Sequence, residues 1–190
     1  MFVVNLYGGP GTGKSTTAAG VFSGLKMRGC NVELVTEVAK DLVWGERMFD
    51  LSNQILVFGE QYHRLFRLKG KVECIITDSP LFLSVVYGEN ETDTFKALVQ
   101  EKYNEFENVD IFLEREKEYN PIGRTQKTEE EAVEVDKKVI DGLQQFIYPN
   151  PLVRMPGNYE TTLHLTDMIY QRLSKSTEGC TCNGCGNPST

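Results

Sequence analysis

Eight residues near the start of the chain have the types and spacing that bind nucleotide phosphates. Glycine stands at the first and sixth positions of this stretch, and Lys14 and Ser15 follow, so the phosphate-loop pattern is complete without a substitution. Glycines let successive backbone N–H groups turn toward an anion at the positive end of the next helix. The pattern predicts a nucleoside triphosphate site formed by Gly8, Gly9, Pro10, Gly11, Thr12, Gly13, Lys14, Ser15 and Thr16.

Two residues of this loop have more specific expected roles. Lys14 would place a positive charge on the β- and γ-phosphates, and the Ser15 hydroxyl is the expected Mg²⁺ ligand. The loop needs a strand before it and a helix after it. Residues 2–7 are a short apolar run typical of a buried strand, and residues 16–27 can form a helix, so both flanks fit.

Two carboxylates follow predicted strands at the sheet edge where ligands bind in open α/β proteins. Glu37 comes after the strand predicted over residues 31–36, and Asp78 comes after the one predicted over residues 72–77. An acid that ends a hydrophobic strand is how phosphate-loop proteins place the carboxylate that organises Mg²⁺ and its waters. We therefore expect Asp78 to be a metal residue, with Glu37 beside it in the site.

The stretch between these strands holds four candidates for contacting a second substrate. Apolar residues spaced by three and four predict one long amphipathic helix from residue 46 to 68. Gln54 and Gln61 share a face of this helix and suit a base or a sugar, or are ordinary half-exposed residues. Trp44 and Phe58 suit an aromatic ring, or belong to the core.

A charged segment after the fourth predicted strand, residues 109–113, has the composition of a lid. It contains Arg115 and Arg124 and cannot be helical throughout, because proline and glycine interrupt it. Closure of a lid at about residues 115–127 would exclude water and bring guanidinium charge to the transferring group. A solvated charged loop is the alternative. Thr128 and Glu131 form a capping-box pattern that opens a helix to about residue 147.

Composition limits the class of protein. The 190 residues are 40% hydrophobic and 25% charged, which suits one domain with a real core, and the net charge of −7 argues against duplex nucleic acid as the main partner. We expect a domain over residues 1–175, with a fifth strand within residues 149–156 and a last helix from residue 159 to about 173. The absence of a basic leader and of long apolar runs predicts a cytoplasmic protein without a membrane span.

The last 15 residues, 176–190, have the composition of a flexible tail, because they are rich in serine, threonine, glycine and asparagine. Cys180, Cys182 and Cys185 have ligand-like spacing but lack a nearby fourth ligand. They bind a metal, within one chain or shared between two chains, or belong to a redox-prone or neutral tail. The sequence leaves open whether the protein is a monomer or a homodimer.

The order of these features resembles the P-loop nucleoside and nucleotide kinases, over about residues 2–173. It is most similar to the branch with ribosylnicotinamide kinase domains and many phage-encoded proteins. The resemblance implies a three-layer α/β fold with a five-stranded parallel sheet, helices on both faces and a lid, with ATP and Mg²⁺ as cofactors. It also implies that Gly157 and Asn158, after the fifth strand, line the adenine.

The same resemblance assigns Lys14 and Ser15 to the phosphates and Mg²⁺, and Asp78 to the metal. It makes Glu37 the carboxylate that accepts the substrate's proton. The kinases usually have Glu-Pro after strand two and Glu-Arg-Ser after strand three, whereas this chain has Glu37-Val38 and Asp78-Ser79-Pro80. The proton acceptor is therefore Glu37 or Asp78.

These observations predict a phosphotransferase that moves the γ-phosphate of ATP to a hydroxyl or phosphate of a nucleoside- or nucleotide-like acceptor. One alternative is a kinase that acts on a hydroxymethylated base in DNA, which would need a cationic track for the strand. Another is a nucleotide-dependent ATPase switch or regulator. A guanine-specific switch would ordinarily contain Asn-Lys-x-Asp, which is absent from the chain.

Overall fold

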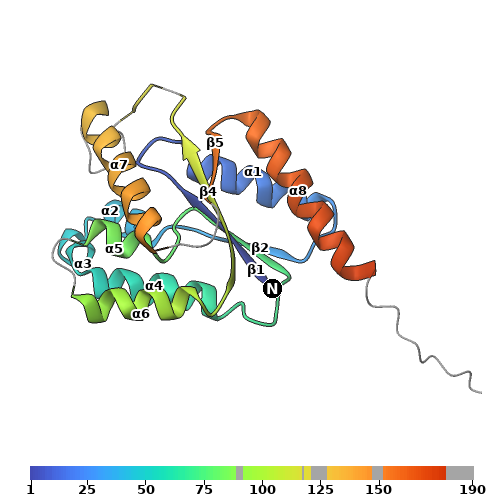
Figure 1. Cartoon of the computed structure of the whole chain (residues 1–190), viewed down its shortest axis with the longest axis horizontal. Coiled ribbons are helices and arrows are strands. Elements are labelled where there is room, and N and C mark those ends of the chain that lie inside the picture. The colour runs from blue at the N-terminus through green and yellow to red at the C-terminus, as the bar shows by residue number, and fades with distance from the viewer. Residues whose placement is uncertain (89–91, 117, 121–127, 147–151, 179–190) are drawn as a thin grey trace, which may run out of the picture.

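The computed structural model shows a five-stranded parallel sheet with helices on both faces (Figure 1). The structure describes residues 1–88, 92–116, 118–120, 128–146 and 152–178. The order across the sheet is β2-β3-β1-β4-β5. The strands are β1 (Phe2–Tyr7), β2 (Val32–Val35), β3 (Cys74–Thr77), β4 (Glu107–Glu114) and β5 (Val153–Pro156). The predicted α/β fold with five parallel strands is confirmed.

Eight helices are present in the described part of the chain. They are α1 (Lys14–Met27), α2 (Val38–Trp44), α3 (Met48–Ser52), α4 (Gln54–Phe66), α5 (Leu83–Tyr87), α6 (Asp93–Tyr103), α7 (Glu129–Phe146) and α8 (Tyr159–Glu178). None of them combines the length and apolar character that a membrane crossing requires.

The central strand β1 separates two hydrophobic cores, because successive side chains of a strand point to opposite faces. Val4 and Leu6 pack with α1 and α8 on one face, whereas Val3 and Tyr7 pack with α4, α5, α6 and α7 on the other (Figure 1). This three-layer arrangement fixes the carboxyl end of β1. The loops that follow β1, β2 and β3 therefore meet at one edge of the sheet.

The prediction of one long helix over residues 46–68 is wrong, because this stretch forms two helices, α3 and α4. Asn53 separates them with an extended backbone (φ −89°, ψ 92°). Its side-chain oxygen accepts a hydrogen bond from the Leu56 N–H at 3.2 Å, which satisfies one of the free donors at the start of α4. An asparagine that caps a helix start thus outweighed a continuous apolar pattern.

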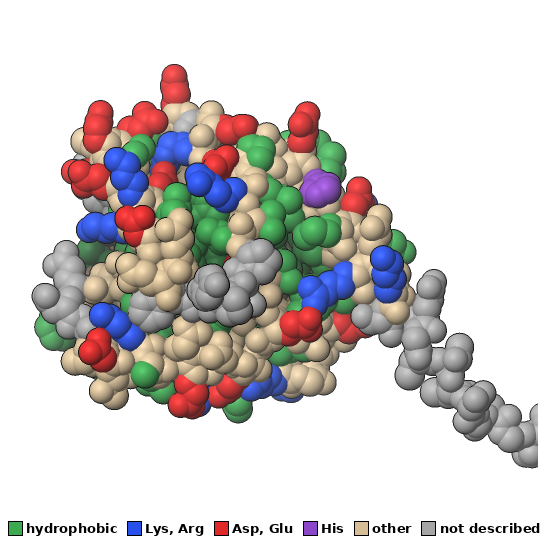
Figure 2. All heavy atoms as spheres, viewed as in Figure 1, with side chains coloured by type: hydrophobic (Ala, Val, Ile, Leu, Met, Phe, Trp, Pro, Cys, Tyr) green, Lys and Arg blue, Asp and Glu red, His purple; other side chains and the backbone are tan. Residues whose placement is uncertain are grey.

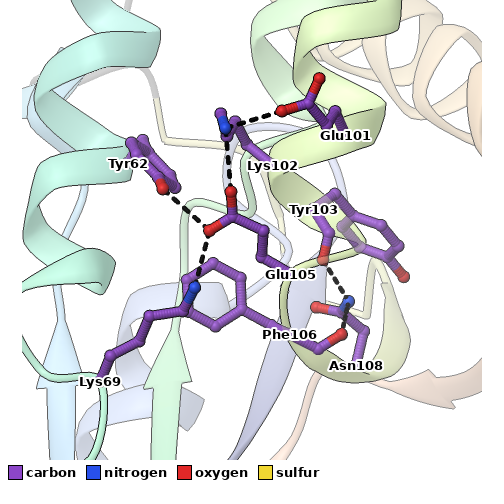
Figure 3. Close-up of polar contacts among 8 residues, drawn as sticks. All are labelled: Tyr62, Lys69, Glu101, Lys102, Tyr103, Glu105, Phe106 and Asn108. Atoms are coloured by element: carbon purple, nitrogen blue, oxygen red, sulfur yellow. Dashed lines mark hydrogen bonds and ion pairs between the residues drawn. The ribbon is translucent and has the colours of Figure 1, made fainter.

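Two other boundaries differ from the sequence expectation. Helix α6 ends at Tyr103, and β4 begins at Glu107, before the start at residue 109 that the sequence predicted. The Asn108 amide donates to the carbonyls of Tyr103 and Phe106, both at 2.9 Å, and so closes the turn between them (Figure 3). The final helix reaches Glu178, five residues beyond the predicted end at residue 173.

A polar cluster joins the last turns of α4 and α6 at the other end of the sheet (Figure 3). Glu105 accepts hydrogen bonds from the Tyr62 hydroxyl at 2.9 Å and Lys69 Nζ at 2.7 Å, and its second oxygen accepts from Lys102 Nζ at 2.9 Å. These donors, above all Lys69, lower the pKa of Glu105 from its ordinary value of 4.5 to about 2.

Glu105 is therefore expected to make folding stability depend on acidity. Because its folded-state pKa is lowered, its contribution is complete above about pH 4.5 and disappears as the pH falls through about 2. In Glu105→Gln, the free energy of unfolding should change less over this range, as measured by urea denaturation at several pH values. The control is Glu101→Gln, since Glu101 bonds only to Lys102 in this cluster. Equal pH dependence in wild type and Glu105→Gln would contradict the assignment.

Candidate active site

The phosphate loop, residues 8–15, connects β1 to α1 as the sequence predicted. Gly8, Gly11 and Gly13 have φ values of 138°, 83° and 96°, a left-handed range that favours glycine. The Thr12 hydroxyl donates to the Gly9 carbonyl at 3.0 Å and holds the loop in its curve. The loop therefore ends at the amino terminus of α1, where backbone N–H groups favour an anion.

Lys14 lies within the curve of this loop. Its Nζ donates to the carbonyls of Gly8 at 2.7 Å and Gly9 at 2.9 Å. Burial lowers the pKa of Lys14, while the nearby carboxylates of Glu37 and Asp78 act in the opposite direction. The loop thus places a cation where the phosphates of a nucleotide would bind.

A cavity of about 400 Å³ opens beside the loop, at the carboxyl edge of the sheet. Its wall combines loop residues with residues from α2, α3, the start of α4, and α5. It is lined by Pro10, Gly11, Gly13, Lys14, Ser15, Thr16, Glu37, Ala39, Lys40, Val43, Leu51, Gln54, Val57, Ser79, Leu83, Ser84 and Tyr87.

The two predicted carboxylates have different surroundings. Glu37 lines the cavity, and burial raises its pKa above the ordinary value of 4.5, with Lys14 acting against the shift and Asp78 adding to it. Asp78 is only 3% exposed. Its Oδ1 has no hydrogen-bond partner within the described residues. Glu37 is therefore accessible to a ligand in the cavity. Asp78 has a buried oxygen that can accept a hydrogen bond or bind a cation.

This free oxygen fits a magnesium site. A buried acceptor without a partner is costly, and Mg²⁺ prefers carboxylate and other oxygen ligands. Ser15 lines the cavity at the start of α1, and Asp78 lies within electrostatic range of Lys14 in the same loop. Ser15 and Asp78 are thus suited to hold the ion with the help of nucleotide phosphates and water.

Arg115 lies against the phosphate loop. One guanidinium nitrogen donates to the Pro10 carbonyl at 2.6 Å, and the other donates to Asp136 Oδ2 at 2.8 Å. The second oxygen of Asp136 accepts from the Gly9 N–H at 2.6 Å. The sequence did not single out Asp136, because it is one of many acids on α7. The other lid arginine, Arg124, is outside the described residues.

Helix α5 contributes cavity residues that the sequence analysis also missed. Ser84 and Tyr87 come from this short helix, just after Asp78 and Ser79. Burial raises the pKa of the Tyr87 hydroxyl, and the charges of Glu37 and Asp136 add to the increase. The hydroxyl of Tyr87 is therefore neutral and is near both carboxylates. Only the position of these residues after a site strand could have suggested them.

Of the four side chains proposed to contact a second substrate, Gln54 lines the cavity and the other three lie elsewhere. Trp44 is 64% exposed at the end of α2. Phe58 packs in the core against Tyr62 and Phe95. Gln61 is buried and bridges to the backbone before α2, where its amide donates to the Thr36 carbonyl and its oxygen accepts from the Val38 N–H. Phe58 is therefore a core residue, as the alternative interpretation stated, whereas Gln61 is not the half-exposed residue that its alternative described, because it is buried.

Of the two residues proposed to line the adenine, Gly157 packs against the phosphate loop and Asn158 caps the last helix. The Gly157 N–H donates to the Glu114 carbonyl at 2.8 Å, and a side chain at Gly157 would come within 2.0 Å of the Thr12 carbonyl. Asn158 caps α8, since its oxygen accepts from the Thr161 N–H at 2.9 Å. The three tail cysteines, Cys180, Cys182 and Cys185, are outside the described residues.

Comparison with solved structures identifies the fold. The deoxyadenosine kinase from M. mycoides, with products dCMP and a flexible dCDP bound, matches with a TM-score of 0.53 and 19% sequence identity. The match covers 92% of this chain and all of that chain. It shows the same α/β arrangement of sheet and helices. No curated protein sequence matches this chain significantly.

The sequence of the chain also matches a known family, described as AAA domain (AAA_28), over residues 3–161. This range is most of the chain and contains the phosphate loop, both strand-end carboxylates and the Arg115–Asp136 pair. The chain therefore belongs to the AAA domain family AAA_28, and it has the fold of a P-loop kinase.

Proposed function

We propose that this protein is an ATP- and Mg²⁺-dependent phosphotransferase that moves the γ-phosphoryl group to a nucleoside- or nucleotide-like acceptor. The observation that carries the proposal is a single cavity with Lys14 and Ser15 at one part of its wall and Glu37 at another. Phosphoryl transfer requires mainly that donor and acceptor are aligned and that developing charge is stabilised. A wall that combines a phosphate loop with an acidic side chain provides both.

On the donor side, the phosphates would occupy the curve of the phosphate loop. Lys14 would exchange its bonds to the Gly8 and Gly9 carbonyls for bonds to the β- and γ-phosphates, where its charge is needed. Ser15 and Asp78 would hold Mg²⁺, which when bound neutralises charge on the β- and γ-oxygens. Arg115, which bonds to the Pro10 carbonyl of the loop, would stabilise charge on the transferring group.

On the acceptor side, Glu37 would orient an acceptor hydroxyl and take its proton. The acceptor oxygen forms a bond to the γ-phosphorus while the bond from the γ-phosphorus to the β–γ bridging oxygen breaks, which releases ADP. The proton passes to the Glu37 carboxylate. Exposure to the cavity favours Glu37 over the buried Asp78 in this role, and a raised pKa makes a carboxylate a better base near neutral pH.

The rest of the wall suits a flat acceptor, and Lys40 adds a positive charge to it. Apolar side chains for packing against a ring stand beside amide and hydroxyl groups for hydrogen bonds, which is the usual composition of small-molecule sites. The apolar residues are Ala39, Val43, Leu51, Val57 and Leu83, and the uncharged polar ones are Gln54, Ser79, Ser84 and Tyr87. A nucleoside fits this pattern, as the name of the structural neighbour also suggests. The ribosylnicotinamide kinase and phage branch stays a prediction.

A DNA acceptor is the second candidate, because a hydroxymethylated base would present a similar hydroxyl. It would need a cationic track beside the cavity. On the face shown in Figure 2, the described lysine and arginine side chains are interspersed with acidic ones and form no continuous track. The overall charge of −7 agrees with this distribution. A small-molecule acceptor is therefore the better supported candidate.

The test is transfer from γ-labelled ATP to a panel of acceptors. The panel contains ribonucleosides, deoxynucleosides, monophosphates, nicotinamide riboside and hydroxymethyl-containing DNA, with Lys14→Ala as the control protein. We expect label on a nucleoside- or nucleotide-like member, and at least a 10²-fold slower rate with Lys14→Ala. Phosphate release to water that no acceptor changes would favour the ATPase switch instead.

A further inference from the structure

We propose that Asp136 is a positioning residue, which holds Arg115 and the phosphate loop in the geometry that phosphoryl transfer requires. This inference rests on the proposed function. Each oxygen of Asp136 has a different partner: Oδ1 accepts from the Gly9 N–H, and Oδ2 accepts from Arg115. Arg115 in turn donates to the carbonyl of Pro10, the next residue of the loop. The four groups therefore close a ring between α7, the segment after β4 and the phosphate loop.

The ring is tight, because the loop touches the backbone of α7. A Cβ atom built on Gly9 would lie 2.3 Å from Asp136 Oδ1 and 2.9 Å from the Ala132 carbonyl. The contact with α7 thus requires a glycine at position 9, because a side chain there would clash. The backbone of Gly9 is not left-handed, unlike that of Gly8 and Gly11. A shift of α7 by a fraction of an ångström would therefore displace the loop.

The charged side chains of this ring, Arg115 and Asp136, are largely shielded from water. The energy of their ion pair therefore depends strongly on the orientation of the two groups. The Arg115 side chain is 9% exposed and that of Asp136 is 16% exposed. A carboxylate that binds a guanidinium and an N–H together fixes the orientation of the guanidinium plane. The Arg115 Nε has no hydrogen-bond partner among the described residues. It is a buried donor that an anion on the loop could use.

The other charged or titratable groups near Asp136 do not replace it. The positive charge of Lys14 lies within its electrostatic range, but Lys14 donates to the Gly8 and Gly9 carbonyls. Tyr87 is also within this range and is neutral. Asp136 is therefore the carboxylate that connects Arg115 to the loop, and its loss should leave Arg115 misaligned.

The experiment compares Asp136→Asn with Asp141→Asn, the same change at an exposed position of α7. With the acceptor found in the panel, we expect kcat to fall about 10²-fold in Asp136→Asn, because small misplacements of a catalytic group have effects of this size. The affinity for ATP, measured by calorimetry, should change much less. Asp141→Asn should behave as wild type. Asp136→Asn added to Arg115→Ala should cause less than about a 3-fold further loss, since both act through the guanidinium.

Two outcomes would overturn the inference alone: a kcat of Asp136→Asn equal to that of Asp141→Asn, or full additivity with Arg115→Ala. Wild-type protein that transfers to no acceptor would instead overturn the proposed function and this inference with it. If Asp136→Asn does not fold, Asp136→Glu serves, because it keeps the charge but displaces both oxygens. A positioning role predicts about a 10-fold loss of kcat with ATP affinity retained, and an unchanged kcat would refute it.

Discussion

Replacing Arg115 with alanine is expected to lower kcat for phosphoryl transfer by about 10³–10⁵-fold, the range seen when an arginine that stabilises the transferring group is removed. The reason is its position: a guanidinium only 9% exposed, bonded to the Pro10 carbonyl of the phosphate loop, acts with little screening by water. Single-turnover transfer from γ-labelled ATP measures the effect. Arg115→Lys should recover only part of the rate, because lysine lacks the planar pair of donors.

The matched control is Arg154→Ala. Arg154 also forms an ion pair near this end of the sheet, with Glu114 at 2.8 Å, but its side chain is 55% exposed. Its removal should leave kcat within a factor of about two, since exposed ion pairs contribute little. Because removing one partner of a buried pair costs about 3–5 kcal/mol of stability, each variant is assayed well below its measured Tm. A folded Arg115→Ala protein with the kcat of Arg154→Ala would contradict the role.

Replacing Glu37 with glutamine is expected to lower kcat by about 10²–10⁴-fold, the usual contribution of a positioned general base. Glutamine keeps the size and the hydrogen-bonding oxygen but cannot accept the proton. The control is Glu60→Gln, an exposed position on α4. If Asp78 were the proton acceptor instead, Glu37→Gln would retain most of its rate.

The pH dependence gives the same assignment a separate test. Since burial raises the pKa of Glu37 above 4.5, the wild-type rate should rise as the pH passes through that raised value, and Glu37→Gln should lack this limb. Stability changes in the opposite direction. A raised folded-state pKa means that ionised Glu37 opposes folding at neutral pH, so Glu37→Gln should have a higher Tm than wild type at pH 7 and lose this advantage in acid.

The features that the sequence predicted correctly depend on neighbours along the chain. The phosphate loop is one continuous stretch, and the apolar runs before Glu37 and Asp78 have strand length and composition. The parallel-strand rule then placed both acids at one edge of the sheet, and the order β2-β3-β1 brings them next to the loop. Local pattern and a general rule of sheet geometry were sufficient for this part of the site.

The errors occurred where a local pattern competed with a polar contact. Asn53 divides the predicted helix by capping α4. Gln61 lies on the expected helix face, but its amide is used by the backbone at Thr36 and Val38. Periodicity predicts which face is buried and does not show which buried amide finds a partner. Gln61, which was predicted to contact a substrate, therefore holds the backbone at the start of α2 instead.

The sequence by itself determined that this chain has a phosphate loop, a parallel α/β sheet and two acids at the end of neighbouring strands. Only the tertiary structure decided that Asp136, 127 residues from Gly9, bonds to the loop and to Arg115, and that α5 completes the cavity wall. The physical reason is that a loop or strand end is set by adjacent residues. A carboxylate on a charged helix acquires its partner only when packing brings the two elements together.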